Sequence, residues 1–487
     1  MGAPTTGVLD RVQKDLLLDG RWEPREERFG VVNPATGDEL ARVADASVDD
    51  ALAALDACSR AGAAWAATSP RERADVLQRA HRLLLERVDQ FAELITLEMG
   101  KPLAESRGEV LYAADYVRWF AEEAPRIHGE YRVAPAGDTR IVTMRQPVGP
   151  CLLITPWNFP LGMITRKVAP ALAAGCTMIV KPAHETPLTC LLMGQLFVEA
   201  GVPAGVLHVL PTTRSSRMSE ALLADPRLRK ISFTGSTGVG STLLKGAAQN
   251  VVRTSMELGG NAPFIVFDDA DVDRAVEGAM VAKFRNGGES CVAANRILVQ
   301  AGVAAEFTAR LEERMRAAVA ADGMDPAATV GPVISDKQRR HVDDLVRDAV
   351  GHGGDLRLGG EARAGAGFFY EPTLITGVPA TARIAREEIF GPVAAVTVFE
   401  DEAEAVALAN DTEFGLTAFV FTNDLNRAFR VSEALETGMV GLNRGLVSNA
   451  AAPFGGVKAS GLGREGGFEG INEYLVTKYV ALDAGTF

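Results

Sequence analysis

Hydrophobic and polar positions recur along this chain with two different periods. From about residue 51 to 124 the chain is rich in Ala, Leu, Glu and Arg at helical spacing, which predicts a string of helices. Beyond residue 150, short apolar runs alternate with helical stretches. Two further segments, 129–145 and 474–482, alternate apolar and polar residues, which is typical of strands.

The middle of the chain predicts a parallel sheet. We expect strands at 151–155, 176–180, 206–210, 230–233 and 251–256, with helices at 161–174, 187–200 and 238–250. Strands that alternate with helices form a sheet covered on both faces, a doubly wound α/β fold that binds ligands beyond its carboxyl strand ends. A second α/β unit should begin at 262–267 and run to about residue 453. Its predicted helices are 304–321 and 337–351, and its predicted strands lie near 394–398 and 418–421.

Composition limits the class of protein. At 487 residues the chain exceeds one ordinary core, so we expect two large domains. A net charge of −13 argues against a nucleic-acid partner, and no apolar stretch is long enough to predict a membrane partner. Five cysteines without paired spacing predict reduced thiols, a cytoplasmic location and no metal site.

One cysteine, Cys291, has unusual neighbours. A free thiol is most often a buried core residue, but Cys291 follows the polar run Asn-Gly-Gly-Glu-Ser at 286–290, which is typical of a loop. We therefore interpret it as a nucleophile. The other four lie in apolar patterns and are expected to be inert packing: Cys58, Cys151, Cys176 and Cys190.

Two other side chains could complete a site around this thiol. Glu257 ends a predicted strand, and it is either a solvated carboxylate or a general base. Gly259 and Gly260 would let the backbone turn sharply after it. Asn158 follows another strand, and it either caps the next helix or donates its amide to an oxyanion. A thiol, a carboxylate and an amide are the groups needed to oxidise an aldehyde through a thioester.

These residues belong to six motifs that occur in order: 156–160 (PWNFP), 180–182 (VKP), 233–237 (FTGST), 257–260 (ELGG), Cys291 and 387–392 (EEIFGP). With them, the chain resembles the aldehyde dehydrogenase superfamily over about 17–478, and within it most resembles succinate-semialdehyde dehydrogenases. The resemblance implies that Cys291 attacks the aldehyde, Asn158 holds the oxyanion and Glu257 activates water.

The resemblance also implies the domain organisation. A Rossmann-like doubly wound cofactor domain would comprise 1–127 and 148–256, and an α/β catalytic domain 257–455. Small β segments at 128–147 and 471–487 would join subunits into a homodimer or homotetramer.

A nicotinamide cofactor is implied as well. The run Gly235-Ser236-Thr237-Gly238 stands between a strand and a helix, where backbone amides can face a pyrophosphate. Its spacing differs from that of ordinary dinucleotide-binding turns. The resemblance assigns cofactor contacts to Thr155, Trp157, Lys181, His184, Gly235, Ser236, Glu388 and Phe390.

The choice between NADP and NAD centres on His184. NAD-selective relatives often have Glu at this place, three residues after the ribose-binding lysine. An imidazole removes the repulsion of a 2′-phosphate, so we expect NADP to be favoured. The adjacent Glu185 could instead restore NAD preference, and His184 could merely cover the adenine.

Substrate choice centres on three positions. In relatives of the succinate type, residues at the places of Arg166, Arg285 and Ser448 bind a distal carboxylate, a task that suits a forked guanidinium. Succinate semialdehyde is therefore the expected small-molecule substrate. Glutarate semialdehyde, an uncharged aldehyde, an acylating reaction with coenzyme A and a catalytically silent structural protein are the alternatives. The chain departs from its relatives at Glu289, where Gln is usual, and at Arg444 and 450–452.

Overall fold

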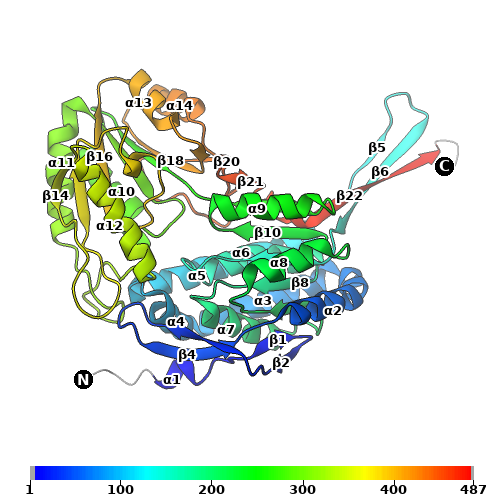
Figure 1. The fold of residues 1–487 in the computed structure, drawn as a ribbon. Coiled ribbons are helices and arrows are strands. Elements are labelled where there is room, and N and C mark those ends of the chain that lie inside the picture. Colours follow the sequence, from blue (N-terminus) through cyan, green and yellow to red (C-terminus); the bar gives the residue numbers. More distant parts are fainter. Residues whose placement is uncertain (1–5, 484–487) are drawn as a thin grey trace.

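The computed structural model describes residues 6–483. It contains two α/β bodies, each built on its own sheet, and a three-stranded sheet that extends away from them (Figure 1). This arrangement confirms the predicted fold class.

The N-terminal part supplies helices to the first body. Helix α1 (Thr6–Leu9) precedes two hairpins, which are β1 (Leu16–Leu18) with β2 (Arg21–Glu23) and β3 (Arg28–Val32) with β4 (Glu39–Ala44). The predicted string of helices is present as α2 (Val48–Ala67), α3 (Pro70–Glu86), α4 (Val88–Met99) and α5 (Leu103–Glu123). Ser47 and Ser69 form capping boxes that fix the starts of α2 and α3.

Five parallel strands form the centre of the first sheet, whose order is β2-β1-β9-β8-β7-β10-β11-β21. They are β7 (Cys151–Ile154), β8 (Met178–Lys181), β9 (Leu207–Val209), β10 (Lys230–Thr234) and β11 (Arg253–Glu257). The edge strand β21 (Gly461–Leu462) is antiparallel. The intervening helices are α6 (Gly162–Ala174), α7 (Pro187–Glu199), α8 (Ser215–Ala224) and α9 (Thr237–Ala248).

Both faces of this sheet are covered. Leu153 belongs to an apolar cluster with residues of α6 and α7, whereas its neighbour Leu152 belongs to a cluster with residues of α8 and α9. Because successive strand residues point to opposite faces, this division confirms the doubly wound prediction.

The second sheet has the order β14-β15-β16-β13-β12-β18-β19. Its strands are β12 (Ala262–Val266), β13 (Ala294–Gln300), β14 (Asp355–Leu358), β15 (Thr373–Thr376), β16 (Val393–Phe399), β18 (Thr417–Phe421) and β19 (Met439–Leu442). Its helices are α10 (Val272–Phe284), α11 (Ala301–Arg316), α12 (Asp336–Gly351), α13 (Glu402–Asn410) and α14 (Leu425–Ala434). A two-stranded sheet pairs β17 (Phe414–Gly415) with β20 (Val457–Lys458).

The helix predicted for 304–321 is wrong at its end. Helix α11 stops at Arg316, and Ala320 forms a bridge with Val330 instead. The helical spacing continues past residue 316, but the backbone there pairs with a distant segment, and tertiary pairing overrides local propensity.

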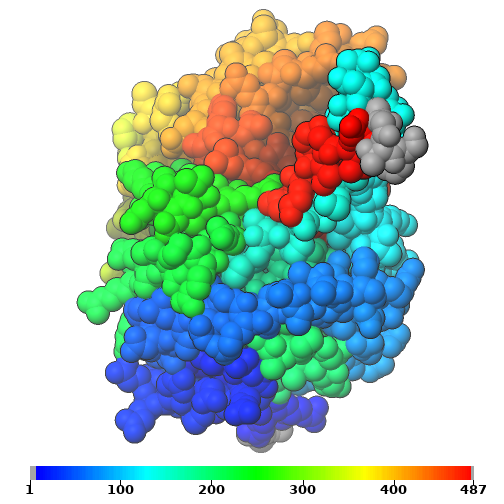
Figure 2. All heavy atoms as spheres, turned by 90° about the vertical axis from the view of Figure 1, so that its right-hand side faces the viewer, coloured from blue at the N-terminus to red at the C-terminus, as the bar shows by residue number. Residues whose placement is uncertain are grey.

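The two alternating segments form the three-stranded sheet. It consists of β5 (Tyr131–Val133), β6 (Thr139–Pro147) and β22 (Leu475–Asp483). β22 pairs with β6 over its whole length, from Leu475 opposite Pro147 to Asp483 opposite Thr139. We call this sheet the arm. It projects from the right of Figure 1, and Figure 2 looks onto it, with β22 in red beside β5 and β6 in cyan.

Candidate active site

The candidate residues begin at the carboxyl edge of the first sheet. Thr155 follows β7, Lys181 ends β8, and Glu257 ends β11. Parallel strands bring these ends to one edge, where doubly wound folds bind their ligands.

Cys291 lies in the loop between α10 and β13. The loop begins with the turn η2 (Arg285–Gly288), in which Asn286, Gly287 and Gly288 have φ values of 61°, 60° and 76°. A Cβ on Gly288 would lie 2.2 Å from the carbonyl oxygen of Gly391, so this position requires glycine. Cys291 is half-buried, whereas the other four cysteines are buried, as expected of packing residues.

Hydrogen bonds join Asn158 to the cysteine loop. Asn158 Nδ2 donates to the carbonyl of Glu289 at 3.0 Å. Asn286 Nδ2 donates to the carbonyls of Asn158 at 3.0 Å and Glu289 at 2.8 Å. An asparagine amide carries two N–H groups, so Asn158 retains one that could serve an oxyanion.

Asn158 does not cap the following helix. The N–H groups of Leu161 and Gly162, at the start of α6, donate to Glu109 Oε1 at 2.9 and 3.1 Å. Lys101 forms a buried ion pair with Glu109 and donates to the carbonyl of Asn158 at 2.8 Å. Sequence reasoning missed this support, because Lys101 and Glu109 belong to no motif and lie about fifty residues upstream.

Glu257 is buried, which argues against the alternative of a solvated carboxylate. Burial raises its pKa well above the usual range, with Glu465 adding to the effect and Arg166 opposing it. Its Oε2 has no hydrogen-bond partner among residues 6–483. A carboxyl group of this kind can accept a proton near neutral pH.

The glycines after Glu257 allow a close contact between two backbone segments and do not form the expected sharp turn. Neither Gly259 nor Gly260 has the positive φ expected of such a turn. A Cβ on Gly260 would instead lie 2.4 Å from the carbonyl oxygen of Cys291. Glycine at 260 therefore lets the end of β11 approach the cysteine loop.

The thiol is neutral in this environment. Burial raises the pKa of Cys291 to about 12, Glu388 and Glu257 act in the same direction, and Arg166 opposes them. A neutral thiol must transfer its proton before it can attack a carbonyl.

Two cavities meet at Cys291. The first has a volume of about 250 Å³ and is lined by Trp157, Asn158, Gly235, Ser236, Glu388, Phe390 and Cys291, among others. The second is narrower and includes Arg166, Arg285, Ser448 and Cys291 in its lining. A more open cavity shares Tyr112, Arg285 and Ser448 with the second and leads outward from it. The thiol is therefore accessible from two sides.

The first cavity contains groups that suit a pyrophosphate. Ser236 stands at the N-terminus of α9, and its side chain makes no capping hydrogen bond, so the hydroxyl is available. A Cβ on Gly235 would lie 2.5 Å from the ring of Phe233. Trp157 and Phe390 face each other edge to face at 5.3 Å. Exposed N–H groups and an uncapped hydroxyl at a helix start are suited to a pyrophosphate.

Glu388 supplies a carboxyl group to this cavity. Its Oε1 accepts a hydrogen bond from the N–H of Gly260 at 3.1 Å, and burial raises its pKa to about 7 while Lys283 opposes the shift.

Two residues of this cavity were not predicted from the sequence, because they lie on α12 outside any motif. Gln338 Nε2 donates to the carbonyl of Phe390 at 2.8 Å, and His341 Nε2 lies 3.2 Å from the carbonyl oxygen of Glu388.

Lys181 and His184 do not line the first cavity. Lys181 Nζ donates to the carbonyl of Pro182 and to Ser215 Oγ, both at 3.0 Å, and burial lowers its pKa to about 8. Ser215 is the first residue of α8. The side chain of His184 is 58% exposed, with Nδ1 3.3 Å from Glu185 Oε2.

The two arginines of the second cavity have different partners. Arg166 is buried and pairs with Glu465 at 2.7 Å. Arg285 is half-buried, with its guanidinium 5.0 Å from the ring centre of Phe159, and it forms no ion pair within residues 6–483. Glu465 had no role in the sequence-based hypothesis.

The departure at Glu289 has a structural explanation. The side chain is buried, its Oε1 accepts a hydrogen bond from the N–H of Ile334 at 3.0 Å, and burial raises its pKa well above the usual range. A neutral glutamic acid has nearly the shape of the glutamine that it replaces.

Within residues 6–483, no helix is long and apolar enough to cross a membrane. The same part of the chain has no group of three or more His, Cys, Asp or Glu side chains arranged to hold a metal ion.

Comparisons with known proteins place these features in context. Residues 22–480 match the model of the "Aldehyde dehydrogenase family". The chain is 56% identical to a succinate-semialdehyde dehydrogenase of Paenarthrobacter nicotinovorans, over 91% of this chain and 98% of the relative. It is 47% identical to a glutarate-semialdehyde dehydrogenase of Pseudomonas aeruginosa, over 96% and 98%. A crystal structure of an E. coli NADP dependent enzyme superposes with a TM-score of 0.96 at 47% identity, covering 97% of this chain and 99% of that one.

Proposed function

The chain belongs to the aldehyde dehydrogenase family, and we propose that it oxidises succinate semialdehyde to succinate with NAD(P) as the hydride acceptor. The observation that carries the proposal is the position of Cys291 between two cavities. One cavity has the features of a dinucleotide site, and the other contains two arginines. The positive charge of these arginines complements an aldehyde with a distal carboxylate.

The proposed chemistry uses the three predicted groups. The thiol of Cys291 gives its proton to solvent, and its sulfur forms a bond to the aldehyde carbon. The N–H groups of Asn158 and the Cys291 backbone hold the resulting oxyanion. A nicotinamide cofactor in the first cavity would supply hydride acceptance, and the oxidised substrate would then be held on Cys291 as a thioester. Glu257 then takes a proton from the water that attacks the thioester, and the acid leaves as the thiolate returns.

Burial prepares Glu257 for that step. Its raised pKa makes it a stronger base than an exposed carboxylate. An acylating enzyme passes its thioester to coenzyme A and needs no such base. A silent structural relative would need none of the three groups. Both alternatives are therefore disfavoured.

Glutarate semialdehyde is the strongest alternative substrate. It differs from succinate semialdehyde by one methylene, and a relative that is 47% identical to this chain carries that name. A methylene in a pocket changes selectivity by only about 10–200-fold. Uncharged aldehydes would leave Arg285 without an anion, so we expect them to be poorer substrates.

We propose that NADP is favoured over NAD. Lys181 and Ser215 are linked at 3.0 Å at the start of α8, where a 2′-phosphate would meet a cation, a hydroxyl and a helix N-terminus. His184 adds no negative charge. Glu185, which lies beside His184, is the one residue of this group that would favour NAD.

The assembly and location are also proposals. We propose a homodimer or homotetramer joined through the arm, and a cytoplasmic enzyme. We also propose a cofactor domain of residues 1–127 and 148–256, a catalytic domain of 257–455, and oligomerisation segments at 128–147 and 471–487. Residues 1–5 and 484–487 lie outside the described residues.

One experiment tests the function. The purified enzyme is assayed for cofactor reduction at 340 nm with succinate semialdehyde, glutarate semialdehyde and butanal, each with NADP and NAD. We expect the highest kcat/KM for succinate semialdehyde with NADP. Equal kcat/KM for butanal would refute a carboxylate-selective pocket, and an absence of turnover on all three would refute the enzyme assignment to this substrate class.

A further inference from the structure

One short segment, residues 101–109, connects the oxyanion donor to the rest of the first body. It joins α4 to α5 and includes the first turns of α5. The N–H of Leu103 donates to the carbonyl of Gly323 at 2.9 Å, and a Cβ on Gly323 would lie 2.4 Å from the carbonyl oxygen of Lys101. The start of the segment is therefore packed tightly against the loop between α11 and α12.

The side chain of Lys101 lies beneath Asn158. It is 1% exposed, and its Nζ forms an ion pair with Glu109 Oε2. The same Nζ donates to the carbonyl of Asn158 at 2.8 Å and lies 4.0 Å from the ring centre of Phe159. A charged donor holds a backbone carbonyl more strongly than a neutral donor does.

The groups around Lys101 favour its charged form. Glu105 and Glu109 are four residues apart and share one side of α5. Burial lowers the pKa of Lys101, Glu109 and Glu105 oppose this shift, and Arg285 adds to it. Burial raises the pKa of Glu289 well above its usual range, and Lys101 opposes that shift.

Asn158 is held at its backbone and at its side chain. Its carbonyl accepts hydrogen bonds from Lys101 Nζ and from Asn286 Nδ2, and its own Nδ2 donates to the carbonyl of Glu289 at 3.0 Å. Its Oδ1 is buried without a partner among residues 6–483. The direction of the remaining amide N–H therefore depends on these three contacts.

The ion pair also holds the residues that follow Asn158. Glu109 Oε1 accepts hydrogen bonds from the N–H groups of Leu161 and Gly162 at 2.9 and 3.1 Å. A buried ion pair adds little net stability, because the cost of desolvation offsets the attraction of its charges. What the pair of Lys101 and Glu109 supplies is a fixed position for the chain around Phe159.

We propose that Lys101 is a positioning residue, which together with Glu109 fixes the Asn158 peptide so that the side-chain amide points at the developing oxyanion. This role rests on the proposed function, because the oxyanion is the one formed in aldehyde oxidation. Lys101 lines neither cavity at Cys291, so it acts through Asn158. Loss of an oxyanion donor slows catalysis about 10²–10³-fold, and Lys101 accounts for part of that factor.

A double-mutant cycle with Lys101→Met and Asn158→Ala tests this role. The readout is acylation of Cys291 by 4-nitrophenyl acetate, in which the sulfur bonds to the acyl carbon, the thiol proton goes to solvent and 4-nitrophenolate leaves. Stopped-flow absorbance gives the rate of the 4-nitrophenolate burst. We expect Lys101→Met to slow the burst about tenfold or more in the wild-type background, but less than about threefold in the Asn158→Ala background.

Two further measurements separate positioning from a general loosening of the fold. The burst of NADP reduction with succinate semialdehyde and with butanal should show the same pattern, because both aldehydes pass through an oxyanion at the same place. The Kd of NADP, from quenching of protein fluorescence, should stay within about threefold of wild type in Lys101→Met, because only the orientation of Asn158 changes. A merely structural role would weaken NADP binding as well.

Lys230→Met is the matched control. Lys230 is also a fully buried lysine of the first body, bonded to Ser255 Oγ and 3.5 Å from Glu473, but it lies at the amino end of β10, away from the edge that carries the site. Its burst should stay within about threefold of wild type. If Lys101→Met does not fold, Lys101→Met with Glu109→Gln removes both charges of the pair and enters the same cycle.

Equal slowing by Lys101→Met in the wild-type and Asn158→Ala backgrounds would overturn the proposal, because the lysine would then act independently of Asn158. Equal slowing in Lys230→Met, or no slowing in Lys101→Met, would also overturn it. The ester reaction needs neither an aldehyde nor a cofactor. A wild type that reduced NADP with none of the aldehydes would therefore refute the proposed function, while the ester cycle would still decide the role of Lys101.

Discussion

At the scale of single residues, the site contains ionisable groups whose burial disfavours the charged form that the proposed chemistry uses. Cys291, Glu257 and Glu388 all have raised pKa values because burial disfavours their ionised forms. The nearby cations, Arg166 beside Glu257 and Lys283 beside Glu388, act in the opposite direction. Perturbed groups that gather at one place are typical of a catalytic centre.

The first prediction separates the two chemical steps. Cys291→Ala should abolish aldehyde oxidation, because no other cysteine lines the cavities at this site, while NADP binding should survive. Glu257→Gln should still form the thioester but hydrolyse it slowly, so stopped-flow absorbance at 340 nm should show a burst without sustained turnover. Cys58→Ala is the matched control, since that buried thiol lies in α2. Turnover near the wild-type rate in Cys291→Ala would exclude the assigned nucleophile.

The second prediction concerns cofactor choice. His184→Glu places a carboxylate beside the proposed 2′-phosphate position, and like charges disfavour binding, so the kcat/KM ratio of NADP to NAD should fall by about tenfold or more. Glu185→Gln removes the carboxylate that lies 3.3 Å from His184 and should move the ratio towards NADP. Both ratios come from initial rates at fixed aldehyde. Strong NAD selectivity in the wild type, unmoved by either variant, would place the determinant elsewhere.

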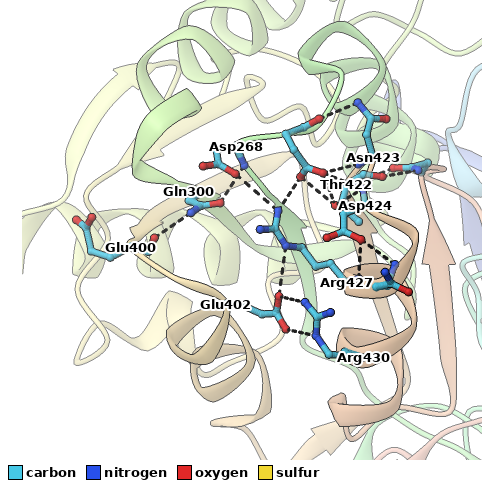
Figure 3. A network of polar contacts seen from close by, with 12 residues as sticks. Asp268, Gln300, Glu400, Glu402, Thr422, Asn423, Asp424, Arg427 and Arg430 are labelled. Atoms are coloured by element: carbon cyan, nitrogen blue, oxygen red, sulfur yellow. Dashed lines mark hydrogen bonds and ion pairs between the residues drawn. The ribbon is translucent and has the colours of Figure 1, made fainter.

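At the scale of elements, a polar network joins the carboxyl ends of β12 and β18 in the second sheet (Figure 3). Asp269 follows β12 and accepts hydrogen bonds from the Thr422 hydroxyl, the N–H groups of Asn423 and Asp424, and Arg427 Nη1 at 2.8 Å. Arg427 also reaches Glu402 at the start of α13. One carboxylate thus joins the ends of β12 and β18 to the start of α14.

The third prediction follows from this network. Burial alone would raise the pKa of Asp269, but Thr422, the backbone of Asn423 and Arg427 hold it below the ordinary value. Asp269→Ala should lower the free energy of unfolding by about 2–3 kcal/mol, measured by urea titration with circular dichroism. The deficit should be complete above the unfolded pKa of about 4 and shrink as pH falls through the lower folded value.

The neighbour provides the control for that variant. Asp268 is half exposed, and its nearest arginine nitrogen lies 3.7 Å away, so Asp268→Ala should change stability by less than about 0.5 kcal/mol. A deficit for Asp269→Ala that stays constant down to pH 3 would indicate lost packing rather than a lost charged network.

The sequence predicted the helices, the strands and the catalytic motifs better than it predicted which side chains contact one another. The period of the apolar positions predicted the five central strands of the first sheet, and the motifs placed Cys291, Asn158 and Glu257. Asn158 and Glu257 follow strands, and topology alone brings such ends together. The partner of Arg166 could not be predicted, because Glu465 lies about three hundred residues further along the chain and belongs to no motif. Gln338 and His341 were missed for the same reason.

At the scale of the whole molecule, the arm exposes unusual side chains. Tyr131 is 64% exposed and Tyr479 is 57% exposed, and Val133 and Met144 are also exposed on the same sheet. Three strands are too few to bury these groups within the sheet. A groove of about 620 Å³ at the root of the arm has a mixed lining, in which Ile127, Phe468 and Leu475 lie beside Arg126, Glu130 and Arg145. Tyr131, Val133 and Met144 share one face of the sheet and Tyr479 lies on the other, and large apolar side chains exposed in this way are typical of an interaction site.

The fourth prediction tests whether a second copy covers that surface. If the arm joins subunits, the wild type should be a dimer or tetramer by light scattering after size exclusion, and Tyr131→Glu with Tyr479→Glu should lower the mass to a smaller species. Buried carboxylates without partners oppose association by several kcal/mol, which is enough to dissociate an interface of moderate affinity. Val251→Glu is the control, because that side chain is 89% exposed and lies on the turn before β11. A wild type of monomer mass, or a double variant that keeps the wild-type mass, would show that the exposed tyrosines do not join subunits.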